Sequence, residues 1–388
     1  MERIYLDNAA TTPINSEVLN EMMPYLTTNY GNPNSLHEFG RIAKSGIEKA
    51  RNQVAKALGC KPSNVYFTSG ATESNNWFIT QFVYTNSKRG KHIITSKIEH
   101  PSVMETCKKL EQEGFTVTYL DVDANGLVKI EDLLHVITGE TILVTIMAAN
   151  NEVGTVQNIQ TIANIAKEHN IVFHTDATQV IGAVNINMKL MGIDALSFSA
   201  HKFNGPKGVG ALCVGDGVKF GKMMLGGEQE SGLRAGTSNV AGIVGLGKAI
   251  ELACRDIAVN SKKLREIRDY FIRNIKDKIE GVKLNGHPKQ RLPNNANFSF
   301  SRIDGESLVC LLDTYGIAVS TGSACSAGDT APSYVLQAMG VPSDLVQGAV
   351  RFSFGVEITK KEIDYVVLKV IESVSKLRKI SPRTKKGR

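Results

Sequence analysis

The chain of 388 residues is 42% hydrophobic and 21% charged, a composition typical of globular proteins that excludes a fibrous or mainly disordered protein. No apolar run approaches the roughly 20 residues that a membrane-spanning helix needs. The first residues, from Met1 to Asp7, lack the order of a signal peptide. We therefore expect a cytoplasmic protein without membrane contacts, and its length predicts two or three domains.

The formal net charge of +7 comes mainly from the C-terminal end. Seven basic residues and no acidic residue follow Glu372: Lys376, Arg378, Lys379, Arg383, Lys385, Lys386 and Arg388. The rest of the chain is therefore nearly neutral. We predict that residues 376–388 form a disordered basic tail and that the protein does not bind nucleic acid directly.

The six cysteines lack the paired spacing of a disulfide framework or a zinc site, so we predict no metal. We predict that five of them are buried: Cys60, Cys107, Cys213, Cys254 and Cys310.

Two stretches resemble ligand-binding loops, but we reject both. Residues 121–126 match half of a calcium-binding loop, yet Asp132 stands where a bidentate Glu belongs, and a turn explains them better. Residues 242–248 resemble a phosphate-binding loop, but Ala249 replaces the residue that holds magnesium.

From about residue 64, short β-rich segments alternate with helical ones. Strands are predicted at 64–68, 92–96, 115–120, 141–147, 171–174 and 195–199, and the segment 209–214 is a candidate antiparallel strand. This alternation predicts an α/β fold, with a mostly parallel sheet and helices on both faces. Functional groups in such folds gather at the carboxyl ends of the strands.

The pattern changes beyond about residue 258. A long charged helix is predicted at 261–278, followed by strands at 297–300 and 318–320. An amphipathic helix that includes the apolar residues from Ile363 to Val374 ends this part. We interpret it as a smaller α+β domain.

Polar residues follow several of the predicted strands. Lys202 comes directly after the strand at 195–199, and Asp176 follows the strand at 171–174, where a buried carboxylate needs a positive partner. The turn at 68–73 opens a helix whose N–H groups favour an anion such as phosphate, and His100 follows the strand at 92–96.

Each of these residues alone has a simpler explanation, such as a solvated lysine, a helix cap or a buried structural histidine. Together they are the parts that pyridoxal 5′-phosphate (PLP) needs: a lysine for a covalent link, a carboxylate for the pyridine nitrogen, a phosphate cradle and a stacking ring.

Cys325 lies in a stretch of small residues between Ser320 and Ser333, with glycines on both sides. Such a stretch has little side chain to bury, so we predict a mobile loop. Cys325 is therefore predicted to be a reactive thiol rather than a buried one.

The chain resembles the cysteine desulfurases of the NifS/IscS type, which are PLP enzymes of fold type I. The resemblance runs almost from end to end and rests on ordered motifs: YLDNAATTP (5–13), GNPNSLH (31–37), GATESN (70–75), EH (99–100), NNEVG (150–154), DATQ (176–179), SAHK (199–202), RAGT (234–237), SAC (323–325) and RFS (351–353). It implies a large domain of residues 14–258 with a seven-stranded sheet. It also implies a small domain of residues 1–13 and 259–375 that carries the cysteine loop.

The resemblance implies a role for each site residue. Lys202 would bind PLP covalently and later move protons, Asp176 would pair with the pyridine nitrogen and Gln179 would bond the phenolic oxygen. His100 would stack on the ring and help proton transfer. The phosphate ligands would be Thr72, Ser199, His201 and, from the other subunit of a homodimer, Thr237; Ala71 would also bind the cofactor.

Asn151, a further cofactor contact, would orient the substrate together with Arg351, whose planar guanidinium suits a carboxylate. One departure from the family pattern is Glu228, where Gly or His is expected; it leaves detail of the dimer interface open.

The implied reaction converts L-cysteine to L-alanine and leaves the sulfur on Cys325 as a persulfide. The sulfur would then pass to an acceptor protein for iron–sulfur cluster assembly or tRNA thiolation, and the sequence does not name this acceptor. A selenocysteine lyase, an aminotransferase-like enzyme and a non-catalytic sulfur-transfer scaffold are the alternatives. Cys325 argues against an aminotransferase, and the retained set of Lys202, Asp176, His100 and Cys325 argues against a scaffold.

Overall fold

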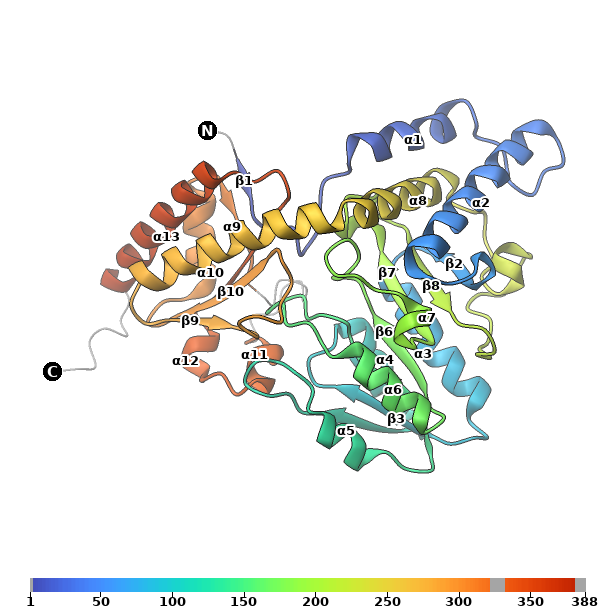
Figure 1. The fold of residues 1–388 in the computed structure, drawn as a ribbon, viewed down its shortest axis with the longest axis horizontal. Helices are drawn as coiled ribbons and strands as arrows, with labels where there is room; N and C mark the ends of the chain where they lie inside the picture. Colours follow the sequence, from blue (N-terminus) through green and yellow to red (C-terminus); the bar gives the residue numbers. More distant parts are fainter. Residues whose placement is uncertain (1–2, 322–331, 381–388) are drawn as a thin grey trace.

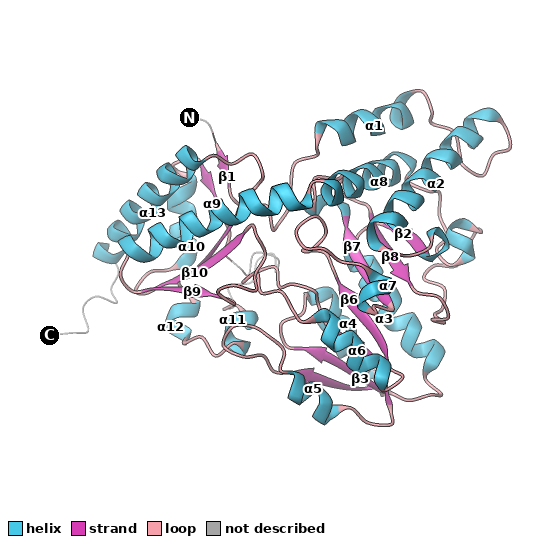
Figure 2. Cartoon of the chain, in the orientation of Figure 1, coloured by secondary structure: helices cyan, strands magenta, loops and turns pink. Residues whose placement is uncertain are grey.

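The structure is a computed structural model that describes residues 3–321 and 332–380. Cys325, and the predicted tail beyond Ile380, lie outside the described residues. Figures 1 and 2 show two regions of α/β structure connected by one long helix, α9 (Ile257–Lys278). Among the described residues, no helix is both long and apolar enough to cross a membrane.

A seven-stranded sheet forms the centre of the larger region. Its spatial order is β2-β8-β7-β6-β5-β3-β4, and only β8 runs antiparallel to its neighbours. The strands are β2 (Val65–Thr68), β3 (His92–Ser96), β4 (Thr116–Leu120), β5 (Thr141–Thr145), β6 (Val172–Asp176), β7 (Ala195–Ser199) and β8 (Gly210–Val214). The α/β fold, its seven-stranded, mostly parallel sheet and the antiparallel strand are therefore confirmed.

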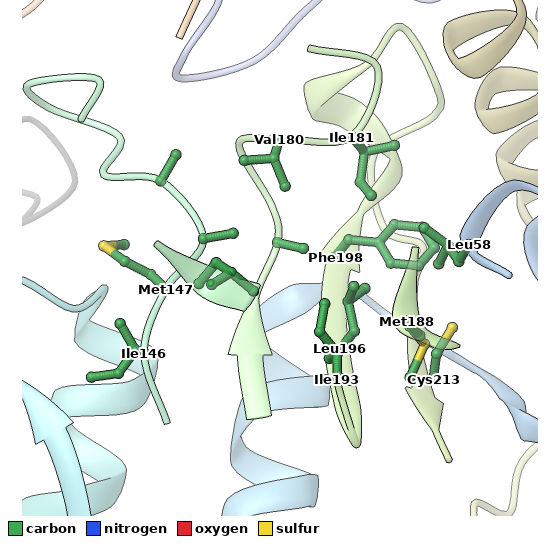
Figure 3. Packing of buried hydrophobic residues seen from close by; sticks show 14 of the residues in the cluster. Leu58, Ile146, Met147, Val180, Ile181, Met188, Ile193, Leu196, Phe198 and Cys213 are labelled. Atoms are coloured by element: carbon green, nitrogen blue, oxygen red, sulfur yellow. The ribbon is translucent and has the colours of Figure 1, made fainter. Parts of the chain in front are cut away.

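Helices cover both faces of this sheet because successive strand residues point to opposite sides. Leu196, Phe198 and Cys213 share one face, where Leu58 and Met188 pack against them (Figure 3). Ala195 and Leu212 point to the other face, toward α3 and α4. The helices of this region are α1 (Ser16–Thr27), α2 (Glu38–Leu58), α3 (Ala71–Asn86), α4 (Pro101–Gln112), α5 (Ile130–Val136), α6 (Ile159–Glu168), α7 (Met188–Met191) and α8 (Val240–Arg255).

The smaller region contains an antiparallel sheet of order β12-β10-β9, with strands β9 (Val282–Asn285), β10 (Asn295–Phe300) and β12 (Ala349–Ser353). A short parallel pair, β1 (Ile4–Tyr5) and β11 (Ile317–Ala318), lies beside it. The remaining helices are α10 (Gly305–Asp313), α11 (Tyr334–Ala338), α12 (Ser343–Val346) and α13 (Lys360–Ile380). The predictions did not include β9 or β12.

The small sheet has one apolar face and one polar face, and both are buried. Phe298 and Phe352 contribute to an apolar cluster with Phe271 of α9. Asn297 and Arg351, which pair in register, belong to the alternate positions of β10 and β12. Asn297 Nδ2 donates to the carbonyl oxygen of Glu152, so the polar face contacts the large region where strand β5 leads into the site.

Two predictions differ from the structure. The chain is still helical at residues 376–380, because α13 continues to Ile380, and Arg378 donates from Nε to Ser301 O at 3.1 Å and from Nη2 to Glu280 O at 2.8 Å. Of the five cysteines predicted to be buried, Cys107 and Cys213 are buried and Cys60 and Cys254 are half-buried, whereas Cys310 is exposed because it lies on the outer side of α10. The boundaries of the two domains stay a prediction.

Candidate active site

A cavity of about 520 Å³ lies at the carboxyl edge of the large sheet. It is formed where β6, β7 and the turns after β2, β3 and β5 end next to one another. Nine residues predicted from the sequence line it: Ala71, Thr72, His100, Asn151, Asp176, Gln179, Ser199, His201 and Lys202. Thr237 and Arg351 are not among its lining residues within the described ranges.

Lys202 ends a single 3-10 turn, Ala200–Lys202, that follows β7 directly. The turn is tight because Phe203 N and Gly205 N both donate to Ala200 O, at 3.1 and 3.0 Å. Lys202 Nζ donates to Ala9 O and Ala10 O, each at 2.7 Å. The N-terminal segment therefore holds the amine at the cavity wall. Gln179 Nε2 donates to the same Ala9 oxygen at 3.1 Å.

Asp176 is the last residue of β6, and it is only 5% exposed. Its Oδ2 accepts from Asn75 Nδ2 at 2.7 Å, and its Oδ1 accepts from Thr178 N at 2.9 Å. Both donors are neutral, and no ion pair to Asp176 occurs within residues 3–321 and 332–380. A buried carboxylate that faces a cavity and makes no ion pair among the described residues is suited to a positively charged ligand.

The anion cradle lies at the start of α3, where the first-turn N–H groups have no carbonyl acceptor within the helix. Ala71 N donates to Ser199 Oγ at 3.3 Å, which connects this helix to the end of β7. The packing behind the cradle is tight, because a Cβ on Gly210 would lie 2.7 Å from Gly70 Cα. Thr72 is exposed at the mouth of the cavity.

Two histidines of the cavity are neutral near pH 7. Burial, with help from Lys202 and Lys207, lowers the pKa of His201 to about 4. Burial also lowers the pKa of His100; the charge of Lys202 adds to this effect, and that of Asp176 opposes it. His100 is the N-cap of α4, where its Nδ1 accepts from Ser102 N at 3.1 Å.

Arg351 lies behind the cavity wall rather than in it. Its side chain is 1% exposed, and its two terminal nitrogens donate to Asp7 Oδ1 at 2.8 Å and to Asn151 O at 3.0 Å. Asn151 itself lines the cavity. Arg351 Nε is buried without a partner among the described residues.

The segment before Thr237 is anchored to the large region by two ion pairs. Glu230 binds Arg51 with both carboxylate oxygens, at 2.9 and 3.0 Å, and it also accepts from Phe67 N at 2.9 Å. Arg234 pairs with Glu73 of α3 at 2.8 Å. Glu228, the residue that departs from the family pattern, is exposed.

The sequence analysis missed several polar residues that support the site. Asn75 and Ser102 are buried next to Asp176 and His100. Glu99 is fully covered, and burial raises its pKa to about 8. Asn75 and Glu99 had a detectable signal, because each is a polar residue within a motif, at 70–75 and at 99–100; Ser102 had none.

Fold and cavity together define the class of the protein: a PLP enzyme of fold type I. The sequence matches the pattern of the Aminotransferase class-V family over residues 4–366. A curated relative from Dictyoglomus turgidum, named cysteine desulfurase IscS, is 50% identical over 379 residues, which cover 98% of this chain and 96% of the relative.

Two solved structures are similar over nearly the whole chain. A NifS-like protein has a TM-score of 0.92 and 42% identity, and the match covers 97% of this chain and 100% of that one. SspA in complex with cysteine has a TM-score of 0.81 and 37% identity, with coverage of 90% and 98%. The chain belongs to the Aminotransferase class-V family.

Members of this family use PLP, and the residues of the cavity fit that cofactor. Asp176 supplies a buried carboxylate that makes no ion pair within the part of the chain that the structure describes, and Lys202 supplies an amine at the same cavity. Thr178 Oγ1, also at the cavity, is buried without a partner among the described residues. The start of α3 supplies N–H groups for a phosphate.

Proposed function

We propose that the protein is a PLP-dependent cysteine desulfurase that converts L-cysteine to L-alanine and transfers the sulfur to Cys325. The observation that supports this most is the arrangement of Lys202, Asp176 and His100 around one cavity, in a chain that is 50% identical to a named cysteine desulfurase. The cysteine bound in the SspA structure is consistent with this substrate.

The predicted lining residues would divide the work of holding PLP. Asp176 would bind the pyridine nitrogen, Lys202 Nζ would supply the amine for the covalent link, and His100 would cover the ring. Gln179 bonds the phenolic oxygen. When bound, PLP withdraws electrons from the α-carbon of an amino acid, which weakens the Cβ–S bond of cysteine. The phosphate ligands are Ala71, Thr72, Ser199, His201 and the Thr237 of a second subunit.

Asn151 and Arg351 orient the substrate, and Lys202 Nζ moves its α-proton. Asn151 would lead the substrate carboxylate to Arg351, because Asn151 lines the cavity and its carbonyl oxygen accepts from the Arg351 guanidinium. The planar fork of an arginine matches a carboxylate and fixes its orientation.

Cys325 takes the sulfur. The Cβ–S bond of cysteine breaks, an S–S bond to Cys325 Sγ forms, and protons from the site complete L-alanine. The described residues on both sides of Cys325 support a position of this segment near the substrate. Ser320 pairs with the backbone of Arg351, and Ser333 Oγ donates to the buried carboxylate of Glu152 at 2.6 Å. The described residues that flank this segment thus lie beside Arg351, at Ser320, and beside Glu152, the chain neighbour of Asn151, at Ser333.

A homodimer completes the site. Thr237 is exposed and does not line the cavity of its own chain as far as the structure is described. Large apolar side chains are exposed before Thr237 in the sequence, at the end of α1 and in the connection from α1 to α2: Leu225 at 85%, Leu26 at 58%, Tyr30 at 71% and Leu36 at 92%. A second copy of this chain would cover them and supply its Thr237 to the phosphate.

The persulfide sulfur passes to an acceptor protein for iron–sulfur cluster assembly or tRNA thiolation, and the protein acts in the cytoplasm.

The division into a domain of residues 14–258 and a domain of residues 1–13 and 259–375 belongs to the same proposal. An apolar cluster whose buried residues all come from the small region, Ile4, Leu6 and residues between Leu264 and Val374, supports a separate small domain.

The test is to reconstitute the protein with PLP, add L-cysteine with a reductant, and assay alanine and sulfide in the same sample. We expect equal amounts of both products from the native protein and neither from Lys202→Ala. Pyruvate or a keto acid in place of alanine would contradict the proposed reaction, and a strong preference for selenocysteine would favour the lyase.

The shared site has its own test. Neither Lys202→Ala nor Thr237→Glu forms an intact site as a homodimer. A hybrid dimer of the two variants has one intact site if Thr237 acts on the partner's cofactor. We expect activity to appear when the two chains are mixed and allowed to exchange, whereas no gain would contradict the shared site.

A further inference from the structure

A hydrogen-bonded chain of two uncharged residues connects Asp176 to His100. Asn75 Nδ2 donates to Asp176 Oδ2 at 2.7 Å and to Ser102 Oγ at 3.0 Å. Ser102 Oγ lies 2.8 Å from His100 Nδ1. Asn75 is 0% exposed and Ser102 is 8% exposed, so water does not substitute for either contact.

The charge of Asp176 determines the direction of every bond in this chain. An ionised carboxylate can only accept hydrogen bonds, so Asn75 must turn its amide nitrogen toward it. The second hydrogen of that nitrogen is then directed at Ser102 Oγ, which must accept it. The hydroxyl proton of Ser102 is left for His100 Nδ1, the remaining neighbour at hydrogen-bond distance.

His100 Nδ1 is therefore an acceptor, and a neutral His100 carries its proton on Nε2. The backbone N–H of Ser102, which also donates to Nδ1, requires the same tautomer. Since His100 lines the cavity and its Nδ1 is occupied, Nε2 is the ring nitrogen that is available to a ligand.

We infer that Asn75 and Ser102 are positioning residues, which hold the carboxylate of Asp176 in place and fix His100 as an Nε2–H donor toward the cavity. This inference rests on the proposed function, because it assigns the two ends of the chain to the same cofactor. Asp176, the partner of the cofactor's ring nitrogen, and His100, the residue that stacks on the ring, thus belong to one hydrogen-bonded unit.

Burying the amide of Asn75 is energetically unfavourable, and an apolar residue could fill the same space without this penalty. Its Oδ1 is buried without a partner among the described residues, and an unsatisfied buried acceptor is unfavourable. An apolar residue of similar size would avoid this cost. The amide is explained by its two donated bonds, to Asp176 and to Ser102.

The experiment measures the ring nitrogens of His100 by NMR in holoenzyme labelled with ¹⁵N-histidine, with His100→Gln used to assign the signals. The same samples give the dissociation constant of PLP. The variants are Asn75→Leu, Ser102→Ala and the conservative Ser102→Thr. Asn76→Leu is the matched control, because Asn76 donates to backbone oxygens of Thr72 and Ser102 and not to Asp176.

We expect wild type and Asn76→Leu to show a protonated Nε2 and an unprotonated Nδ1. Asn75→Leu should bind PLP about 10- to 100-fold more weakly, because a hydrogen bond to a charged group is lost. The share of His100 in the Nε2–H tautomer should fall, because only the backbone N–H of Ser102 then still favours it. Ser102→Ala should change the tautomer signals with a smaller effect on PLP, and Ser102→Thr should restore them.

A wild-type His100 protonated on Nδ1 would overturn the inference. So would ring signals that stay unchanged in both Asn75→Leu and Ser102→Ala. If Asn75→Leu does not fold, the two Ser102 variants decide alone. The NMR measurement needs no turnover, so a protein with the expected tautomer that forms no alanine would contradict the proposed function and leave this inference standing.

Discussion

Arg351 Nη2 donates to Asp7 Oδ1 at 2.8 Å, in an ion pair where the arginine side chain is 1% exposed. The pair connects β12 of the small region to the N-terminal segment, whose Ala9 and Ala10 carbonyls hold Lys202. The same guanidinium bonds Asn151 O at the cavity wall. One short stretch of chain, residues 7–10, thus holds both Arg351, the proposed ligand of the substrate carboxylate, and Lys202, the proposed ligand of the cofactor.

Arg351→Lys tests the substrate contact. Lysine keeps the positive charge beside Asp7, so the fold should persist, but it cannot form the two parallel bonds of a guanidinium. We expect KM for L-cysteine to rise about 10-fold or more with a smaller change in kcat, as steady-state kinetics would measure. A normal KM would show that Arg351 has only a structural role.

Glu230→Ala tests the anchor of the segment that leads to Thr237. The Glu230 side chain is 6% exposed and pairs with Arg51, and removing one partner of a buried pair typically costs about 3–5 kcal/mol. Glu230 and Ser231 also have φ angles of 45° and 60°, which are unfavourable for residues other than glycine. The pair offsets that strain.

We expect Glu230→Ala to lower the free energy of unfolding in urea by several kcal/mol and to weaken PLP retention. Glu228→Ala is the matched control, since Glu228 is an exposed carboxylate two residues away. Equal effects of the two substitutions would contradict the anchor.

Glu99→Gln tests a buried carboxyl group. Burial raises the pKa of Glu99 from 4.5 to about 8, against the opposing bonds from Ser96 and Met147 N. The folded state therefore favours the protonated form. Its stabilising contribution is full below pH 4.5 and is lost as the pH rises from 4.5 to 8.

Glutamine does not titrate, so the stability of the wild type relative to Glu99→Gln should decline across this window, by at most about 1.4 kcal/mol per pH unit. Urea unfolding of the apoprotein at several pH values measures the difference. A constant difference would mean that the folded protein does not hold Glu99 in its protonated form.

Two truncations test the C-terminal helix. Ending the chain after Ser375 removes the last residues of α13 and the bonds of Arg378 to Ser301 and Glu280. Ending it after Ile380 keeps them. We expect the shorter chain to lose thermal stability and the longer one to match the full chain, with desulfuration by the folded protein unchanged in both. A loss of activity on removal of residues 381–388 would assign the tail a role in the reaction.

The local patterns of the sequence were sufficient for the large sheet, because short β-rich runs such as 141–145 and 195–199 alternate with helical segments along the chain. The small sheet was harder. Residues 349–353 alternate polar and apolar side chains, but Asn297 and Arg351 are buried against the large region, which only the tertiary structure reveals. The helix end at Ile380 was missed because a basic run was read as a solvated tail.

Most of the site was predictable because its residues lie within short sequence motifs, and nine of the predicted residues line one cavity. The supporting residues were not. Ser102 contacts Asn75 across 27 positions of sequence, and Arg51 contacts Glu230 across 179, so no local pattern reveals either pair. The placement of Arg351 behind Asn151 also follows from the packing of the two regions and not from the RFS motif alone.

The most direct test of the central proposal is a single turnover with ³⁵S-labelled L-cysteine in the absence of reductant, followed by peptide mass analysis and an assay of alanine. The account predicts one added sulfur atom on the peptide that contains Cys325, with one alanine formed for each sulfur transferred. Cys325→Ser should keep the yellow colour of bound PLP and bind cysteine, but should release almost no sulfide. Label on another residue, or normal turnover by Cys325→Ser, would contradict the persulfide mechanism.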